Sequence, residues 1–252
     1  MNQNFILQTQ DLSVWFPIST GVLSGLRPRY IRAVNGVSLS VQRGETLGIV
    51  GESGCGKTTL GRTIMKLQPP TSGRIIFDGT DITDYGFREM KPIRRNLQMI
   101  FQDPYASLDP RMRVGECIGE PLALQQPALT RDERRTAVLK LMEQCGLPEK
   151  DYEKFPHEFS GGQRQRIGIA RALVLHPKLL LCDEPVSALD VSIQAQLINL
   201  MMKLQREYEL TMLFISHDLS VISHVADRVA VMYLGQIVEL ATRDEIFRRP
   251  LH

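Results

Sequence analysis

The sequence lacks the features of a disulfide-stapled or membrane-spanning protein. Its four cysteines, Cys55, Cys117, Cys145 and Cys182, are widely spaced and form no Cys-x-x-Cys pair, which favours a reduced compartment over a disulfide framework or a zinc site. No apolar run approaches the ~18 residues of a membrane span, and the first ten residues lack the basic and apolar regions of a signal peptide. We therefore expect a cytosolic protein that reaches a membrane only through a partner.

An excess of charge of one sign is also missing. The 30 Lys and Arg residues nearly balance the 28 Asp and Glu residues, so net charge gives no reason to expect nucleic-acid binding. Two local basic clusters, within residues 27–32 and 91–95, are typical of a solvated face or a partner contact. No internal repeat or low-complexity tract interrupts a composition that is ordinary for a soluble globular protein.

The chain does contain short apolar strands that alternate with helical segments. Residues 5–41 read as strands around a Gly/Pro/Arg insertion at 21–28, and residues 114–171 read as mostly helical. A strand is predicted at 46–50 and a helix at 57–67, stopped by Pro69 and Pro70. Two further strands are predicted at 179–182 and 211–215, and each is followed by a helix, at 191–208 and 219–226. Such βα units predict an α/β fold with a parallel sheet that binds ligands at the carboxyl ends of its strands.

A glycine-rich loop follows the strand at 46–50 and matches G-x-x-x-x-G-K-[ST] in full, with a strand before it and a helix after it. Its glycines let backbone N–H groups cradle phosphate oxygens at a helix N-terminus. Lys57 can reach the β- and γ-phosphates, and the Thr58 hydroxyl can hold Mg²⁺. The predicted phosphate-binding residues are Gly51, Glu52, Ser53, Gly54, Cys55, Gly56, Lys57, Thr58 and Thr59. Alone, this loop indicates only a nucleoside triphosphate.

Two acidic residues, Asp183 and Glu184, end the apolar strand at 179–182. On an isolated strand, these two acids would be interpreted as part of a solvent-exposed turn. With a phosphate loop in the same chain, we predict that Asp183 holds the metal and that Glu184 orients or deprotonates the attacking water. His217 follows the next apolar strand, so we expect it at the same sheet edge, where it can contact the γ-phosphate and steady Glu184.

Further segments carry a resemblance to a family. The residues Phe159-Ser160-Gly161-Gly162-Gln163 resemble the LSGGQ signature of ABC ATPases, with Phe159 where Leu is usual. The segment Ser187–Asp190 resembles the D-loop, and Gln102 resembles the glutamine of the Q-loop. The resemblance implies that Ser160, Gly161, Gly162, Gln163 and Asp190 face the nucleotide held by another subunit, that Gln102 senses Mg²⁺ and the membrane partner, and that two cassettes sandwich two ATP molecules head to tail.

The resemblance narrows further to the peptide/nickel importer ATPases, and within them to the F-type subunit. It rests on residues 102–111, Phe155-Pro-His157 and the ending Arg249–His252. It implies MgATP as the ligand, a related D-type ATPase as partner, two membrane permeases, an extracytoplasmic binding protein, no nucleic acid, and a place on the cytoplasmic face of the membrane. Family members usually continue past such an ending with a tail that often has a cysteine cluster; we expect that tail to be absent, and claim no iron–sulfur site.

The same resemblance sets the expected organisation of residues 1–252 as one nucleotide-binding domain. About 1–50 form an N-terminal antiparallel β subdomain and the first core strand, 51–112 and 172–252 the RecA-like catalytic core, and about 113–171 the α-helical signature subdomain. An aromatic residue should stack on adenine, and both Tyr30 and Phe16 are candidates. Tyr30 is favoured over Phe16, and an aromatic residue at either position could equally serve core or edge packing.

Two other functions are weighed against ATP-driven import. A non-transport ABC ATPase acting on nucleic acid or ribosomes usually has coiled-coil insertions, Cys-x-x-Cys pairs or two cassettes in one chain, and none of these occurs. A P-loop GTPase or small-molecule kinase would have no use for the FSGGQ and SALD segments, and the sequence has no N-K-x-D motif. We therefore predict an ATPase subunit that energises a membrane importer, with peptides as the predicted cargo.

Overall fold

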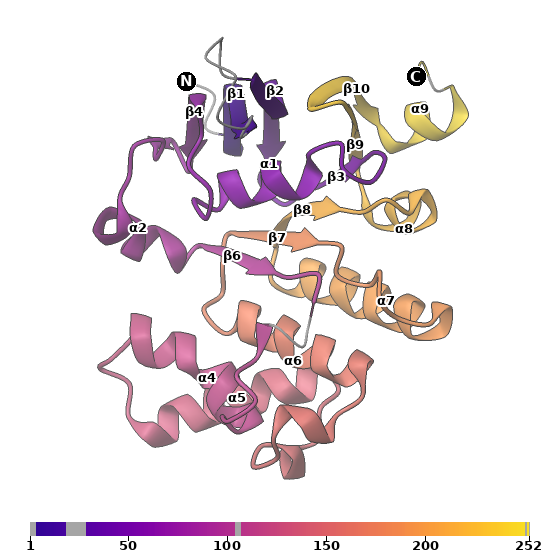
Figure 1. Cartoon of the computed structure of the whole chain (residues 1–252). Helices are drawn as coiled ribbons and strands as arrows, with labels where there is room; N and C mark the ends of the chain where they lie inside the picture. Colours follow the sequence, from indigo (N-terminus) through magenta and orange to yellow (C-terminus); the bar gives the residue numbers. More distant parts are fainter. Residues whose placement is uncertain (1–3, 19–28, 104–106, 250, 252) are drawn as a thin grey trace. The chain divides into compact units, whose positions relative to one another are not determined.

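The computed structural model describes residues 4–18, 29–103, 107–249 and 251. The insertion expected at 21–28 lies outside these residues, as do parts of the 102–111 and 249–252 segments. The chain divides into two compact units, which are described one at a time (Figure 1). Unit 1 comprises residues 1–86 and 213–252, and unit 2 comprises residues 87–212.

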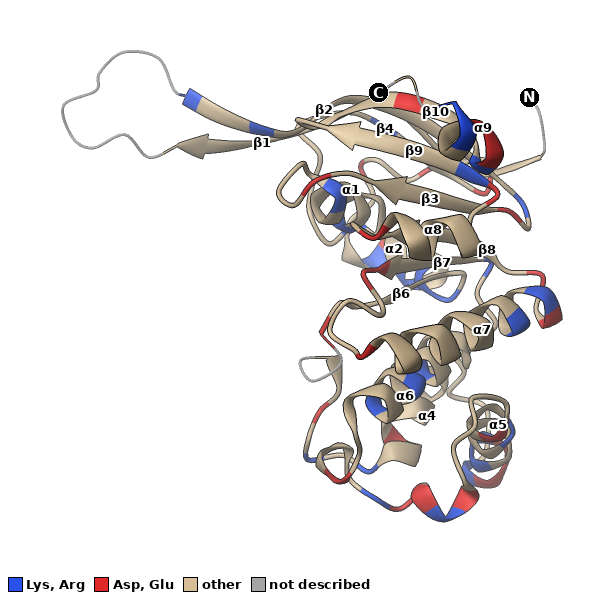
Figure 2. Cartoon of the chain, turned by 90° about the vertical axis from the view of Figure 1, so that its right-hand side faces the viewer, with Lys and Arg blue, Asp and Glu red and all other residues tan. Residues whose placement is uncertain are grey.

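Unit 1 contains a four-stranded antiparallel sheet with the order β2-β1-β4-β5. Its strands are β1 (Phe5–Ile18), β2 (Arg29–Gln42), β4 (Ser72–Phe77) and β5 (Thr80–Asp81). Val34, Val37, Leu39 and Val41 of β2 are all buried, as their spacing predicts. The paired ends of β1 and β2 form a ribbon that extends past β4, and basic residues lie along the β2 side of it (Figure 2).

Unit 1 also contains the strand that leads into the phosphate loop. Strand β3 (Thr46–Val50) is fully buried and pairs in parallel with β9 (Arg228–Tyr233), which pairs with the antiparallel β10 (Gln236–Thr242). Strand β8 (Thr211–Ile215) passes from unit 2 into unit 1, and its last residues lie beside β3. The helices of this unit are α1 (Lys57–Ile64), α8 (Leu219–Val225) and α9 (Arg243–Arg248).

Helix α1 ends earlier than predicted, at Ile64 instead of Leu67, and Pro69 and Pro70 do not stop it. Lys66 adopts a left-handed conformation with φ of 55°. The Leu67 amide then bonds to the Arg62 carbonyl at 2.8 Å, and the Lys66 amide bonds to the Thr63 carbonyl at 3.0 Å. This Schellman arrangement satisfies the last carbonyls of the helix and closes it.

Unit 2 combines two parallel strands with a group of helices. Helices α4 (Val114–Gln125), α5 (Arg131–Gln144) and α6 (Gly161–Leu173) pack against one another, and the connection from α5 to α6 includes the short 3₁₀ turns η1 (Glu149–Asp151) and η2 (Pro156–Glu158) (Figure 1). The remaining elements are α2 (Phe87–Arg94), β6 (Leu97–Ile100), β7 (Leu179–Asp183) and α7 (Val191–Glu207).

The buried face of α7 differs slightly from its prediction. Leu197, Leu200, Met201 and Leu204 are buried as expected, whereas Ile193 is only half-buried. Ile193 lies in the first turn of the helix, next to Gly162 of α6. Within the part of the chain that the structure describes, no helix is both long and apolar enough to cross a membrane.

Candidate functional site

The phosphate loop of unit 1 is built so closely against neighbouring backbone that two of its positions require glycine. A Cβ at Gly51 would lie 2.2 Å from the Met232 carbonyl oxygen, and one at Gly56 would lie 2.0 Å from the Ala33 carbonyl oxygen. Gly56 also has φ of 110°, in the left-handed region that side chains rarely adopt. The loop is therefore held between β2 and β9, strands that are distant in sequence.

A tight turn supports the loop from behind. The Gly235 amide, between β9 and β10, donates to the Cys55 carbonyl at 2.9 Å, and the Gly235 carbonyl accepts from the Asn35 amide at 2.8 Å. Leu234 and Gly235 both have positive φ, at 44° and 82°, as a two-residue type I′ hairpin requires. Sequence reasoning missed this support; the only available signal was Leu234-Gly235 between two apolar runs.

Lys57 begins α1 and is buried, with 5% of its surface exposed. Its ammonium group donates to the carbonyl oxygens of Gly51 and Glu52, both at 2.8 Å. No side chain caps the helix at Gly56, so no capping side chain competes with an anion at this helix start. A helix start that no side chain caps, with an ammonium group beside it, fits a phosphate chain.

His217 belongs to unit 1, as does the phosphate loop. The Ser216 amide bonds to the Ile49 carbonyl of β3 at 3.1 Å, so the chain leaves β8 beside the end of the strand that enters the loop. His217 itself is exposed. The next residue, Asp218, caps α8, and the hydrogen bond from the Ser220 hydroxyl is the main cause that lowers the pKa of this carboxyl group.

In unit 2, strand pairing brings Gln102 and Glu184 together. Strands β6 and β7 are parallel with Ile100 opposite Cys182, so residues two positions further on fall side by side. The Gln102 amide nitrogen donates to a Glu184 carboxylate oxygen at 3.1 Å. Asp183, at the end of β7, is buried with 2% of its surface exposed.

The backbone at Glu184 is held in an unfavourable conformation. Its φ is 46°, which for a residue with a side chain is uncommon and costs roughly 1–2 kcal/mol. The turn that follows stabilises this conformation, because the Ser187 hydroxyl donates to the Glu184 carbonyl at 3.1 Å. Backbone strain at an acidic residue that follows the carboxyl end of a strand is typical of a functional residue.

The signature segment forms a helix start with a reciprocal cap. The Ser160 hydroxyl accepts from the Gln163 amide at 3.4 Å, and the Gln163 side chain accepts from the Ser160 amide at 3.0 Å. A Cβ at Gly162 would lie 2.6 Å from Ile193 of α7, so this glycine is required for close helix packing. Asp190 precedes α7, and its carbonyl accepts from the amides of its first turn.

The two candidate adenine-stacking residues lie on opposite faces of the β1–β2 ribbon. Phe16 pairs with Ile31, and the adjacent Pro17 pairs with Tyr30, so their side chains alternate. Tyr30 is 47% exposed and Phe16 is 36% exposed. Trp15, which sequence reasoning did not consider, lies with its ring 6.2 Å from the Tyr30 ring. Only one face can meet a given nucleotide, and the preference for Tyr30 stays a prediction.

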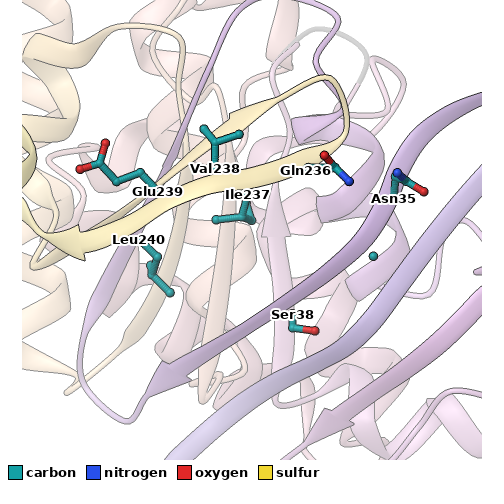
Figure 3. Close-up of a pocket in the computed structure, with 8 residues that line it drawn as sticks. Asn35, Ser38, Gln236, Ile237, Val238, Glu239 and Leu240 are labelled. Atoms are coloured by element: carbon teal, nitrogen blue, oxygen red, sulfur yellow. The ribbon is translucent and has the colours of Figure 1, made fainter. Parts of the chain in front are cut away.

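A separate open groove of about 390 Å³ lies between β2 and β10 of unit 1. Asn35 and Ser38 of β2 line it on one side, and residues 236–240 of β10 line it on the other (Figure 3). None of the predicted site residues borders this groove. It therefore contributes nothing to the phosphate-binding chemistry.

Three residues are predicted to supply oxygen ligands for a metal. Thr58 follows Lys57 in unit 1, whereas Gln102 and Asp183 belong to unit 2. Among the described residues no group of three or more His, Cys, Asp or Glu side chains could hold a metal ion by itself. Hydroxyl, amide and carboxylate oxygens are nevertheless the donor types that Mg²⁺ prefers beside a phosphate.

These features define a class of protein: a nucleotide-binding α/β ATPase with a phosphate loop, an acidic strand end and a glycine-rich helix start. The ABC transporter family model matches residues 34–187, and the chain belongs to this family. The predictions of an ABC cassette fold and of an ATPase are thereby confirmed.

Relatives of known name cover nearly the whole chain. It is 53% identical over its full length to the oligopeptide transport ATP-binding protein AppF of Bacillus subtilis (strain 168), and it spans 76% of that protein. It is 52% identical over 98% of its length to the oligopeptide transport ATP-binding protein OppF of Salmonella typhimurium, and spans 74% of it. These likenesses confirm the predicted resemblance to peptide-transport ATPases.

Solved structures agree with the fold. A dimeric post-hydrolysis structure of the ATP-binding cassette MJ0796 bound to ADP and Pi matches with a TM-score of 0.83 at 28% identity. The match covers 94% of this chain and 98% of that one. CbiO1 from Clostridium perfringens, part of the transporter complex cbiONQ, matches with a TM-score of 0.82 at 29% identity, covering 98% and 92%.

Proposed function

We propose that this chain binds and hydrolyses ATP to drive the import of peptides by a membrane complex. The hydrogen bond between Gln102 and Glu184 carries the catalytic part of the proposal, because it fixes the carboxylate of a strained residue at a sheet edge. The transported ligand is proposed from the relatives, which are named as oligopeptide transport proteins.

The phosphate loop and Lys57 would bind the triphosphate. Successive backbone amides donate to phosphate oxygens, and the ammonium group balances their charge. Lys57 is fixed for this role by its bonds to the carbonyls of Gly51 and Glu52. Binding therefore orders little new structure in the loop, which keeps its entropic cost small.

Thr58, Asp183 and Gln102 are the residues that would hold Mg²⁺. When bound, this ion neutralises charge on the phosphate oxygens. Glu184 would orient the attacking water and accept its proton, and the bond from Gln102 keeps one carboxylate oxygen in place. His217, exposed beside the end of β3, would contact the γ-phosphate.

The partner would be a second ABC ATPase, a related D-type chain, arranged head to tail. In that arrangement Ser160, Gly161 and Gly162 would face the nucleotide bound by the other chain. The dimeric cassettes among the similar structures support a dimer. Two permeases and an extracytoplasmic binding protein complete the proposed importer, which would place this chain on the cytoplasmic face of the membrane.

The test is purification of the tagged protein from its native membranes, followed by mass spectrometry of the co-purifying chains and an assay of MgATP hydrolysis. We expect two polytopic permeases, a second ATPase, and hydrolysis that rises when peptide and binding protein are supplied. Recovery of ribosomes or nucleic acid that stimulate hydrolysis would favour the non-transport alternative. Phosphate transfer to a metabolite would instead indicate a kinase.

A further inference from the structure

Ser216 is the last buried residue before His217 and makes two hydrogen bonds on either side of it. Ser216 is 5% exposed, whereas His217 is exposed. The Ser216 amide donates to the Ile49 carbonyl of β3 at 3.1 Å. The Ser216 hydroxyl accepts from the Asp218 amide at 3.0 Å. The second bond therefore spans His217 and closes a turn of the Ser/Thr type around it.

The residue after His217 is held by helix α8. The Asp218 carboxylate accepts from the Ser220 amide at 2.8 Å and from the Ser220 hydroxyl at 2.6 Å, which caps the start of the helix. Helix α8 packs closely on β3, because a Cβ at Gly48 would lie 2.9 Å from the Ile222 side chain. His217 consequently lies between two residues that are both held against β3.

Strand β3 is also the strand that enters the phosphate loop. Ile49, which accepts the bond from the Ser216 amide, lies two residues before Gly51, where that loop begins. These residues all belong to unit 1. The backbone of His217 is therefore placed relative to the phosphate loop by a short series of contacts within one unit.

The Ser216 hydroxyl serves the turn and not the sheet. The bond to Ile49 is made by main-chain atoms, so Ser216→Ala would keep it. The same substitution would remove the acceptor of the Asp218 amide. Its effect should therefore fall on the turn around His217. Threonine would keep the oxygen acceptor, and cysteine would keep the size of the side chain with a weaker acceptor.

We propose that Ser216 is a positioning residue for ATP hydrolysis: its hydroxyl holds the turn that directs His217 toward the γ-phosphate at the phosphate loop. The inference rests on the proposed ATPase function, in which His217 contacts that phosphate. It predicts an effect on the hydrolysis step and little effect on ATP affinity, because Lys57 keeps its own bonds to the loop carbonyls.

The experiment measures single-turnover hydrolysis of MgATP by the complex purified from native membranes, which also quantifies slow variants. We expect Ser216→Ala to lower the rate constant about fivefold with the Kd for ATP within about twofold, as the loss of one hydrogen bond used in the transition state. Ser216→Thr should hydrolyse ATP at nearly the wild-type rate. Ser223→Ala is the matched control: it removes a hydroxyl that donates to the Ser220 carbonyl at 2.7 Å within α8, and it should leave the rate constant unchanged.

A double-mutant cycle with His217→Ala separates positioning from general damage. If Ser216 acts through His217, the double variant should have the rate constant of His217→Ala alone. Should Ser216→Ala fail to fold, Ser216→Cys takes its place in the cycle. Rate losses that multiply, an equal loss in Ser216→Thr or Ser223→Ala, or a wild-type rate in Ser216→Ala would overturn the inference while leaving the ATPase assignment intact. A wild-type complex that does not hydrolyse MgATP would overturn the proposed function and this inference with it.

Discussion

At the scale of single residues, the phosphate loop offers two glycines that differ in what surrounds them. A methyl group at Gly56 would meet backbone at 2.0 Å, whereas one at Gly54 would meet nothing within 4 Å, although both residues have positive φ. We expect Gly56→Ala to destabilise by about 3 kcal/mol and to abolish ATP binding, and Gly54→Ala to cost only about 1 kcal/mol. Urea unfolding and titration with a fluorescent ATP analogue measure both effects.

The opposite order of damage in these two variants would contradict this explanation. If Gly54→Ala were the more damaging of the pair, contact with β2 would not be what fixes the loop. A side chain at Gly54 would then be harmful only because it disturbs the nucleotide.

Glu184 is the second residue with a sharp prediction. Glu184→Gln keeps the size and the partner at 3.1 Å but removes the proton acceptor, so phosphate release should slow by roughly 10²–10⁴-fold while ATP still binds. Glu207→Gln is the control: it changes an exposed glutamate that pairs with Lys203 in α7, and the variant should hydrolyse ATP at the wild-type rate. Near-normal turnover in Glu184→Gln would show that another group takes the proton.

At the scale of elements, the end of α7 contains a residue that is poorly suited to its conformation. Glu209 has φ of 51°, and the next amide, of Leu210, bonds back to the Gln205 carbonyl at 3.0 Å. Glycine is the preferred residue at such a position. Glu209→Gly should therefore raise stability by roughly 0.5–1 kcal/mol, whereas Gln196→Gly, on the exposed middle of the same helix, should lower it by about 1 kcal/mol.

Thermal unfolding of the two variants provides the measurement, because glycine is predicted to act with opposite sign within α7 and just beyond its end. A loss of stability in both would mean that the entropy of the unfolded chain outweighs the strain at Glu209.

The same scale shows how far sequence reasoning reaches. Strands β3, β7 and β8 are found within one residue because each is a short apolar run bounded by turns or by acids. The end of α1 is missed because Lys66, not glycine, adopts the left-handed conformation there. The backing of the phosphate loop by Ala33 and Met232 could not be predicted either, since it depends on strand pairing between distant segments.

Among the candidate site residues, those within one continuous sequence motif were the easiest to predict. Gln102 and Glu184 come together because two parallel strands pair in a register that the sequence does not state. The choice between Tyr30 and Phe16 is a question of which ribbon face meets the nucleotide, and alternation alone cannot answer it.

At the scale of the whole molecule, the proposed head-to-tail arrangement can be tested with two variants that each damage one half of a composite site. Lys57→Ala removes the ammonium group that the phosphate loop supplies. Ser160→Asp keeps a good cap for α6 but places a negative charge where a phosphate held by another chain would lie. Ser160→Asn, which also caps the helix and is neutral, controls for the changed side chain.

Each of the two damaging variants should be inactive when assayed alone as a purified chain. If copies of this chain pair with one another, half of the random dimers in an equal mixture join Lys57 of one copy to Ser160 of the other in one intact site, so about a quarter of wild-type hydrolysis should return. No recovery, with active wild-type chain, would mean that each copy uses its own Ser160. A wild-type chain that is inactive until a second ATPase is added would instead show that the composite site needs a non-identical partner, because only that partner then supplies the capping residues.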